Sequence, residues 1–285
     1  MRVLLTGGSG DLGTLLALDL LRRGDSPVNL DLRPPQAENT GDYLQGSITE
    51  RGILAETMQG VDAVVHIAAW HGLHEFRQSK DAYEFWDVNV TGTFNVFEAA
   101  HQAGVERVVY ISSTSIAERF GLYGHTKIVG EEIAQTYHER HQMNVLSLRP
   151  RAFIPHWNRA TYGNFIEWVQ WFWGGAVHIQ DVKQGALKAL DKLAQPVDYA
   201  ALILDGAHEY TEEDLAHWHG LTSFRKYYAA YEELALRYGL DPARKPSHYD
   251  ISDTKAFLGY APEYSLRNLL QELEAYGEAG PPRPF

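Results

Sequence analysis

The sequence contains no cysteine among its 285 residues. Disulfide bonds, thiolate metal sites and a cysteine nucleophile are therefore excluded. Clusters of basic residues are also missing, and the formal net charge is -12, with 25 Lys and Arg against 37 Asp and Glu. Because affinity for nucleic acid depends on grouped basic side chains, this composition argues against a nucleic-acid partner.

Long apolar runs are absent as well. No stretch approaches the roughly 20 apolar residues of a membrane span, and residues 3–5 are too short for a signal peptide. We therefore expect no membrane partner and a cytoplasmic location. With 45% hydrophobic residues, the chain can bury one large core or two modest ones.

Short apolar runs alternate with helical patterns through the first half of the chain. Strands are expected over 2–6, 28–32, 63–67, 108–111, 145–148 and 197–204. Helices are expected over 12–23, 48–58, 89–103 and 123–141, and later over 157–173, 211–221, 224–238 and 265–276. Continuous apolar strands separated by helices predict an α/β fold with a doubly wound parallel sheet covered on both faces.

The later part of the chain predicts a smaller, mostly helical C-terminal lobe. We expect residues 1–150 to form a nucleotide-binding domain, to which strand and helix segments near 176–205 return. Residues 151–175 and 206–285 then form the substrate lobe. The tail 278–285 is expected to be flexible because its prolines lack backbone donors.

A glycine-rich turn, T-G-G-S-G-D-L-G, follows the first predicted strand. Gly7, Gly10 and Gly13 would let a phosphate approach the N-terminus of the next helix, whereas the alternative is a turn that binds nothing. The second strand ends at Asp31, where a carboxylate can bind ribose hydroxyls. Its negative charge favours NAD over NADP, although Arg33 keeps NADP as an alternative.

Tyr123 and Lys127, in Y-G-H-T-K, stand one helical turn apart on one face. A cation roughly 5 Å from a phenol, at an effective dielectric near 20, would lower the tyrosine pKa by about 2 units and favour acid/base chemistry. The alternative is an ordinary helix with Tyr inside and Lys outside. Ser112, Ser113 and Thr114 follow the strand 108–111, at the sheet edge where ligands of such folds bind.

These motifs together resemble the extended short-chain dehydrogenase/reductase family, of the NAD-dependent sugar epimerase/dehydratase type, over nearly the whole chain. The resemblance is carried by T-G-G-S-G-D-L-G, L-D-L, H-I-A-A-W, N-V-T-G-T, V-Y-I-S-S-T, Y-G-H-T-K, L-R-P and Y-D-I-S-D-T-K-A-F-L-G-Y-A-P-E-Y-S-L. It implies a Rossmann-type fold, an NAD cofactor and a sugar or sugar-nucleotide substrate.

The resemblance also implies roles for individual residues. Tyr123 would be the general acid/base, Lys127 would hold the nicotinamide ribose, Ser113 would bind the reacting oxygen, and Asn89 would support the active-site helix. Cofactor contacts would come from Gly7, Gly10, Asp11, Leu12, Gly13, Asp31, Leu32, Ser47, Ile48, Ile67, Ala68, Ala69, Tyr123, Lys127 and Pro150.

Departures from the family pattern narrow the reaction. Dehydratases place an Asp-Glu pair where this chain has Thr114 and Ser115, so 4,6-dehydration is disfavoured. Ala152 stands where UDP-sugar epimerases carry an asparagine. An NAD-dependent epimerase and a uronate-like sugar dehydrogenase remain as readings, with a non-catalytic NAD sensor or scaffold as the alternative.

Other candidates are weaker. His71, Thr114 and Arg151 are expected near the substrate, and Arg151 could recognise a carboxylate or phosphate. His217 and His219 lack a third ligand, so no metal is expected. The aromatic segment 157–173 is either a lid or core. A homodimer is expected from the family, with apolar positions supplied by Phe94, Phe97, Val129 and Ile133.

Overall fold

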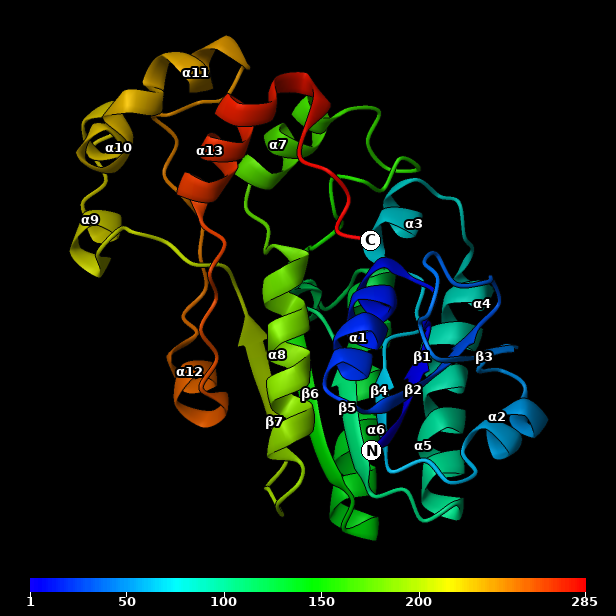
Figure 1. The fold of residues 1–285 in the computed structure, drawn as a ribbon. Helices are drawn as coiled ribbons and strands as arrows, with labels where there is room; N and C mark the ends of the chain where they lie inside the picture. Colours follow the sequence, from blue (N-terminus) through cyan, green and yellow to red (C-terminus); the bar gives the residue numbers. More distant parts are fainter.

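The computed structural model describes residues 1–285 and contains one parallel sheet of seven strands in the order β3-β2-β1-β4-β5-β6-β7 (Figure 1). The strands are β1 Arg2–Thr6, β2 Ser26–Asp31, β3 Asp42–Gln45, β4 Ala63–His66, β5 Arg107–Ile111, β6 Asn144–Pro150 and β7 Ala200–Leu204. The predicted doubly wound fold is confirmed. The edge strand β3 was not predicted because D-Y-L-Q contains no apolar run.

Thirteen helices surround this sheet and form the lobe. In the sheet half they are α1 Asp11–Arg22, α2 Arg51–Thr57, α3 Gly72–Phe76, α4 Ala82–Phe85, α5 Thr93–Gln102, α6 Leu122–His141, α8 Ile179–Lys192 and α12 Ser252–Leu258. In the lobe they are α7 Phe165–Trp173, α9 Glu212–Ala216, α10 Leu221–Tyr228, α11 Glu232–Arg237 and α13 Leu266–Tyr276. None of these helices combines the length and apolarity that a bilayer crossing requires.

Alternate strand residues enter two separate hydrophobic cores. Val3 and Leu5 of β1 pack with α1 and α8 on one face, whereas Leu4 packs with α2, α5 and α6 on the other. Both faces are therefore covered, which is why the strands read as continuous apolar runs.

The helix predicted over 89–103 begins earlier than expected. Residues Ala82–Phe85 are α-helical, Trp86–Gly92 form a π-helical segment, and Thr93–Gln102 continue as α5. Asn89 lies inside the π-helical segment, where the backbone bulges and changes the direction of the side chains that follow.

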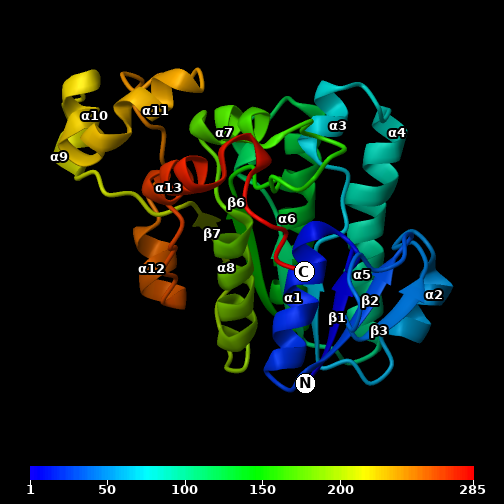
Figure 2. The same cartoon turned by 45° about the horizontal axis from the view of Figure 1, so that its top comes forward.

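The lobe lies beyond the carboxyl ends of the strands and has its own core (Figures 1 and 2). The aromatic segment belongs mainly to this core, because Phe165, Trp168 and Phe172 are buried. The division of the chain near residues 150, 175 and 205 stays a prediction. The packing adds one segment to the sheet half, since Ile251 and Tyr260, which flank α12, join the core of α1 and α8.

The C-terminal tail is docked, and the expectation of a flexible tail is wrong. The carbonyl of Pro281 lies 3.1 Å from Nε2 of His156, the Phe285 ring packs edge-on against Trp157, and Arg283 contacts Gln36. The chain end therefore returns from the lobe to the N-terminus of α1 (Figures 1 and 2).

Candidate active site

The turn between β1 and α1 accepts only glycine at two positions. Gly7 has a φ of +70°, and a Cβ added there would lie 3.0 Å from the backbone nitrogen of Ala68. A Cβ on Gly13 would lie 2.6 Å from Cα of Gly8. Gly7 thus holds the turn against the segment after β4, and Gly13 packs the start of α1 on the turn itself. The turn lies where the strand order reverses and where ligands of such sheets bind.

Donors in this turn lack partners. Helix α1 begins at Asp11 after Gly10, which supplies no side-chain cap, so the N–H groups of the first turn, including those of Leu12 and Gly13, have no intrahelical acceptor. The Oγ of Ser9 is buried and has no hydrogen-bond partner. A helix N-terminus with unpaired donors and no side chain in the way fits the phosphates of a dinucleotide.

Asp31 stands at the end of β2, beside this turn. One of its carboxylate oxygens accepts the N–H of Ser9 at 3.1 Å, and the other accepts the N–H of Arg33 at 3.0 Å. The Nε of Arg33 lies 3.8 Å from the same carboxylate. The carboxylate is thus fixed where a ribose next to the phosphates would lie, and the charge of Arg33 is drawn towards it.

The other predicted cofactor residues follow the carboxyl ends of neighbouring strands. Leu32 follows β2, Ser47 and Ile48 follow β3, Ile67, Ala68 and Ala69 follow β4, and Pro150 ends β6. The carboxylate of Asp11 is engaged elsewhere, because it accepts hydrogen bonds from Trp157 Nε1 at 3.0 Å and Asn158 Nδ2 at 2.9 Å. These bonds link the glycine turn to the chain that enters the lobe.

Ser113, Tyr123 and Lys127 meet at the same edge. Ser113 follows β5, and its hydroxyl lies close enough to the phenol of Tyr123, the second residue of α6, to influence the pKa of that phenol. One turn later, Lys127 is only 3% exposed, and its Nζ donates to the carbonyl of Ile111 at 2.7 Å. Nζ lies 5.9 Å from the centre of the Tyr123 ring. The predicted spacing thus brings phenol, hydroxyl and amine together.

Burial controls the electrostatics of this group. It raises the pKa of Tyr123 to about 12, although the nearby Ser113 hydroxyl opposes the increase. Burial also lowers the pKa of Lys127 to about 7, against the attraction of the Glu131 carboxylate. The predicted lowering of the Tyr123 pKa is therefore not found in this structure, because desolvation outweighs a cation that is itself close to losing its proton.

Asn89 connects the loop after β4 to the catalytic helix. Its side-chain oxygen accepts the N–H of Trp70 at 2.8 Å, and its Nδ2 donates to Trp70 O at 2.9 Å and to Thr126 Oγ1 at 3.0 Å. The carboxamide is buried and its partners are all protein groups. Asn89 thus ties the loop after β4 to α6, and its role in catalysis stays a prediction.

His71 and Gly72 come at the end of this loop, and Gly72 packs against the ring of Tyr123. His71 caps α3 by accepting the N–H of Leu73, and burial lowers its pKa to about 4. A Cβ on Gly72 would lie 3.1 Å from Cδ1 of Tyr123. The neutral imidazole of His71 therefore adjoins Gly72, which packs on the Tyr123 ring. His71 remains a candidate for substrate contact.

Glu75 is a positioning residue that the sequence did not indicate. Its carboxylate accepts the N–H of Leu122 at 2.7 Å and that of Tyr123 at 2.8 Å. Because α6 has no side-chain cap of its own, Glu75 supplies one from α3. No local pattern could reveal this contact, since 47 and 48 residues separate the partners.

Glu131 is the second residue of this kind. It lies one helical turn after Lys127 and is buried, with Ser112 Oγ donating to one oxygen and Arg149 Nε donating at 2.8 Å. Its position one turn from Lys127 was available in the sequence, but its partners on β6 and after β5 were not.

Arg151 is less available than predicted. It is buried, its Nη1 lies 3.2 Å from Asp205 Oδ2, and it donates to Ser247 O at 2.6 Å. It lines a cavity of about 90 Å³. Because its charge is already paired, the structure gives Arg151 a role in joining β6 to the lobe. Thr114 lies between these regions, with Oγ1 3.5 Å from the carbonyl of Pro150.

The glycine turn, the carboxylate at Asp31 and the Tyr-Lys-Ser group on one sheet edge define the short-chain dehydrogenase/reductase class of the Rossmann fold. The family model for the NAD dependent epimerase/dehydratase family matches residues 3–167. Because that match covers more than half of the chain, the protein belongs to this family.

Relatives and solved structures agree with this assignment. The chain is 28% identical to the uncharacterised protein y4nG of Sinorhizobium fredii, over 94% of this chain and 76% of that one. It is 34% identical to a 3 beta-hydroxysteroid dehydrogenase/Delta 5-->4-isomerase of Mycobacterium tuberculosis, over 52% of this chain and 46% of the relative. A uronate dehydrogenase of Pseudomonas putida is 28% identical over 54% of this chain and 62% of its own length.

Two solved structures share the whole fold. MoeE5 in complex with UDP-glucose and NAD has a TM-score of 0.71 at 22% identity, covering 95% of this chain and 96% of its own. A UDP-glucuronic acid 4-epimerase from Bacillus cereus in complex with NAD has a TM-score of 0.70 at 20% identity, with the same coverage. The lobe as well as the sheet is therefore shared with these proteins.

Glu75→Ala should destabilise the fold, because two N–H groups at the start of α6 lose a charged acceptor. We expect the free energy of unfolding to fall by about 1–3 kcal/mol in urea denaturation. Glu75→Gln, which keeps one acceptor oxygen, should lose less. Glu118→Gln is the matched control, because its exposed side chain has no hydrogen-bond partner. Equal losses in Glu75→Ala and the control would contradict the capping role.

Lys127→Met should stabilise the protein at pH 7 while removing the catalytic amine. The unfolded chain holds the lysine proton up to pH near 10.4, whereas the folded pKa is about 7. The unfolded state therefore binds more protons between these values, and wild-type stability should rise with pH across that window. The variant should lack this rise, and the exposed Lys255→Met should keep it. Parallel pH profiles for wild type and Lys127→Met in denaturant titrations would refute the buried cation.

Proposed function

We propose that this protein is an NAD-dependent oxidoreductase that oxidises a secondary hydroxyl of a sugar-type substrate, such as a uronic acid or another aldose derivative. The observation that carries this proposal is the convergence of Tyr123, Lys127 and Ser113 at the sheet edge beside the glycine turn. The uronate dehydrogenase relative supports the dehydrogenase reading.

The cofactor fits the residues of the first half of the chain. The uncapped first turn of α1 and the buried Ser9 hydroxyl would hold the phosphates, and Asp31 would accept the ribose hydroxyls. A phosphate on that ribose would meet the Asp31 carboxylate, which favours NAD over NADP. When bound, NAD supplies the hydride acceptor and donor of the reaction.

The side chains of the protein manage the proton. In its phenolate form, the oxygen of Tyr123 would take the proton of the substrate hydroxyl and become a phenol. The hydride of the adjacent C–H bond would pass to the nicotinamide, so a ketone or lactone forms. Ser113 would hydrogen-bond the reacting oxygen and stabilise the phenolate before it takes the proton. Protonated Lys127 favours that phenolate, and its bond to Ile111 O fixes its place. Glu131, one turn away, favours the protonated amine.

An NAD-dependent epimerase is the second candidate. Its first step is the same, but the hydride returns to the opposite face of the keto intermediate. The structures of a UDP-glucuronic acid 4-epimerase and of a UDP-galactose 4-epimerase match 95% of this chain, which supports this second candidate. Thr114 and Ser115 at the dehydratase positions continue to disfavour 4,6-dehydration.

We also infer a homodimer in the cytoplasm. Phe94 on α5 is 44% exposed and Val129 and Ile133 on α6 are half-buried, so a partner could cover this face. Phe97 is fully buried inside the subunit, so its predicted place at the interface is wrong. Light scattering at micromolar concentration tests this assembly.

A substrate panel with a Tyr123→Phe variant tests the proposed function. Protein with NAD or NADP is incubated with uronic acids, aldoses, UDP-sugars and a 3β-hydroxysteroid, and absorbance at 340 nm is followed before product analysis. We expect NADH to accumulate with a sugar acid or aldose, and Tyr123→Phe to lose about 10²–10⁴-fold in turnover while NAD binding by calorimetry is kept.

Each other outcome of the panel has a separate meaning. An altered sugar without net NADH would establish the epimerase, and NADH from the steroid alone would exclude a sugar substrate. NAD binding with no turnover in any arm would favour the sensor or scaffold reading. The exposed Tyr83→Phe is the matched control and should behave as wild type.

A further inference from the structure

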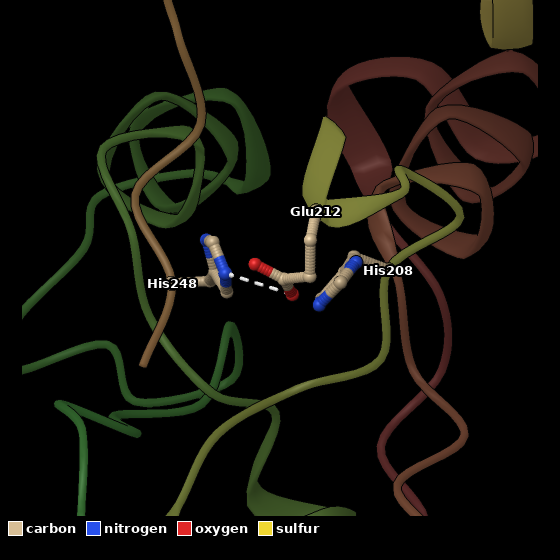
Figure 3. A group of neighbouring side chains, drawn as sticks. All are labelled: His208, Glu212 and His248. Carbon is tan, nitrogen blue, oxygen red and sulfur yellow. Dashed lines mark ion pairs between the residues drawn. The ribbon is translucent and has the colours of Figure 1, made fainter. Parts of the chain in front are cut away.

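We propose that His208, Glu212 and His248 form a binding site for a divalent transition-metal ion, Zn²⁺ in particular, in the C-terminal lobe. Figure 3 shows the carboxylate of Glu212 between the two imidazole rings. His208 lies in the connection from β7 to α9, Glu212 is the first residue of α9, and His248 lies in the connection to α12. The proposal is independent of the reaction at Tyr123.

The spacing of the three side chains is close to that of a zinc site. One nitrogen of each histidine and one oxygen of Glu212 lie within 4.8 Å of one another, and His248 Nε2 is 3.6 Å from Glu212 Oε1. Ligand atoms of a tetrahedral zinc ion, with bonds of about 2.0–2.1 Å, are about 3.3 Å apart. A shift of about 1 Å would complete the site, and the Glu212 side chain is 83% exposed and free to make it.

His208 is held in the form that binds a metal. Its Nδ1 lies 3.0 Å from the carbonyl oxygen of Tyr210, which can only accept, so Nδ1 carries the proton. The lone pair is thereby placed on Nε2, which is left for a metal. A backbone carbonyl on the second ring nitrogen is the usual support of a metal-binding histidine.

The donor set selects the class of metal. Two neutral imidazoles and one carboxylate suit Zn²⁺ and related transition-metal ions, whereas Ca²⁺ and Mg²⁺ prefer sets made of oxygen. Three protein ligands would leave a fourth position for water. The ion would also neutralise the Glu212 carboxylate, which His248 can do only when protonated.

The position of the site gives it a structural role. His208 and His248 both line the cavity that contains Arg151. Beside them, Asp205 accepts the N–H of Tyr249 at 2.8 Å, and Arg151 binds Ser247 O. The ion would link the connection from β7 to α9 with the connection to α12, in addition to the contacts of Asp205 and Arg151. It would thereby stabilise the side of the cavity that these two connections form.

Calorimetric titration of metal-stripped, untagged protein with ZnCl₂ tests the proposal. We expect one ion per chain, and a Tm rise of about 5 °C at a hundredfold excess over Kd. His208→Ala, His248→Ala and Glu212→Gln should each weaken binding by more than about 100-fold, because loss of even an outer-shell partner costs about 10–100-fold.

Two other histidine pairs serve as controls, since this chain carries 13 histidines. His217→Ala/His219→Ala removes an exposed neighbouring pair, and His101→Ala/His141→Ala removes a pair whose rings lie 3.9 Å apart. Neither control should change the stoichiometry or the affinity. Absence of binding to wild type, or equal binding by wild type and the three ligand variants, would overturn the proposal.

Discussion

The carboxamide of Asn89 is the contact on which the geometry of the catalytic edge depends. It binds both backbone groups of Trp70 and the hydroxyl of Thr126, so the loop after β4 and helix α6 are held at one buried point. Loss of any one bond would leave a buried polar group unpaired, at about 1–3 kcal/mol. The three hydrogen bonds of Asn89 are therefore expected to form together. The π-helical segment that carries Asn89 is thus part of the candidate site.

The low polarity around Tyr123 and Lys127 is the second feature that determines the chemistry of the candidate site. Lys127 is buried and Tyr123 is half-buried, and desolvation shifts the pKa of each so that its neutral form is favoured. The charged forms that the proposed chemistry requires, the Tyr123 phenolate and the Lys127 ammonium, are therefore disfavoured unless an opposite charge lies nearby. Glu131, fixed by Arg149, supplies part of that opposition. An apolar residue at position 127 would make the protein more stable, so stability alone does not explain why a lysine stands there.

The sequence predicted those features whose cause is local. Continuous apolar runs indicated every central strand, and the four-residue spacing of Tyr123 and Lys127 indicated that both lie on one face of α6. Glu75 and the pairing of Arg151 with Asp205 depend on contacts between residues about 50 positions apart, and no periodicity encodes them. The short strand β3 is held by backbone pairing to β2 rather than by an apolar face, so its composition gave no signal.

The path of the chain has a consequence for how this protein can diversify. The chain enters the lobe after β6, returns as α8, leaves after β7, returns as α12, enters the lobe again as α13 and ends as a tail on α1. No single cut separates the lobe from the sheet. A lobe from a relative could not be transplanted as one cassette, so new specificities would have to arise by substitution in place, residue by residue, on a scaffold that both halves share.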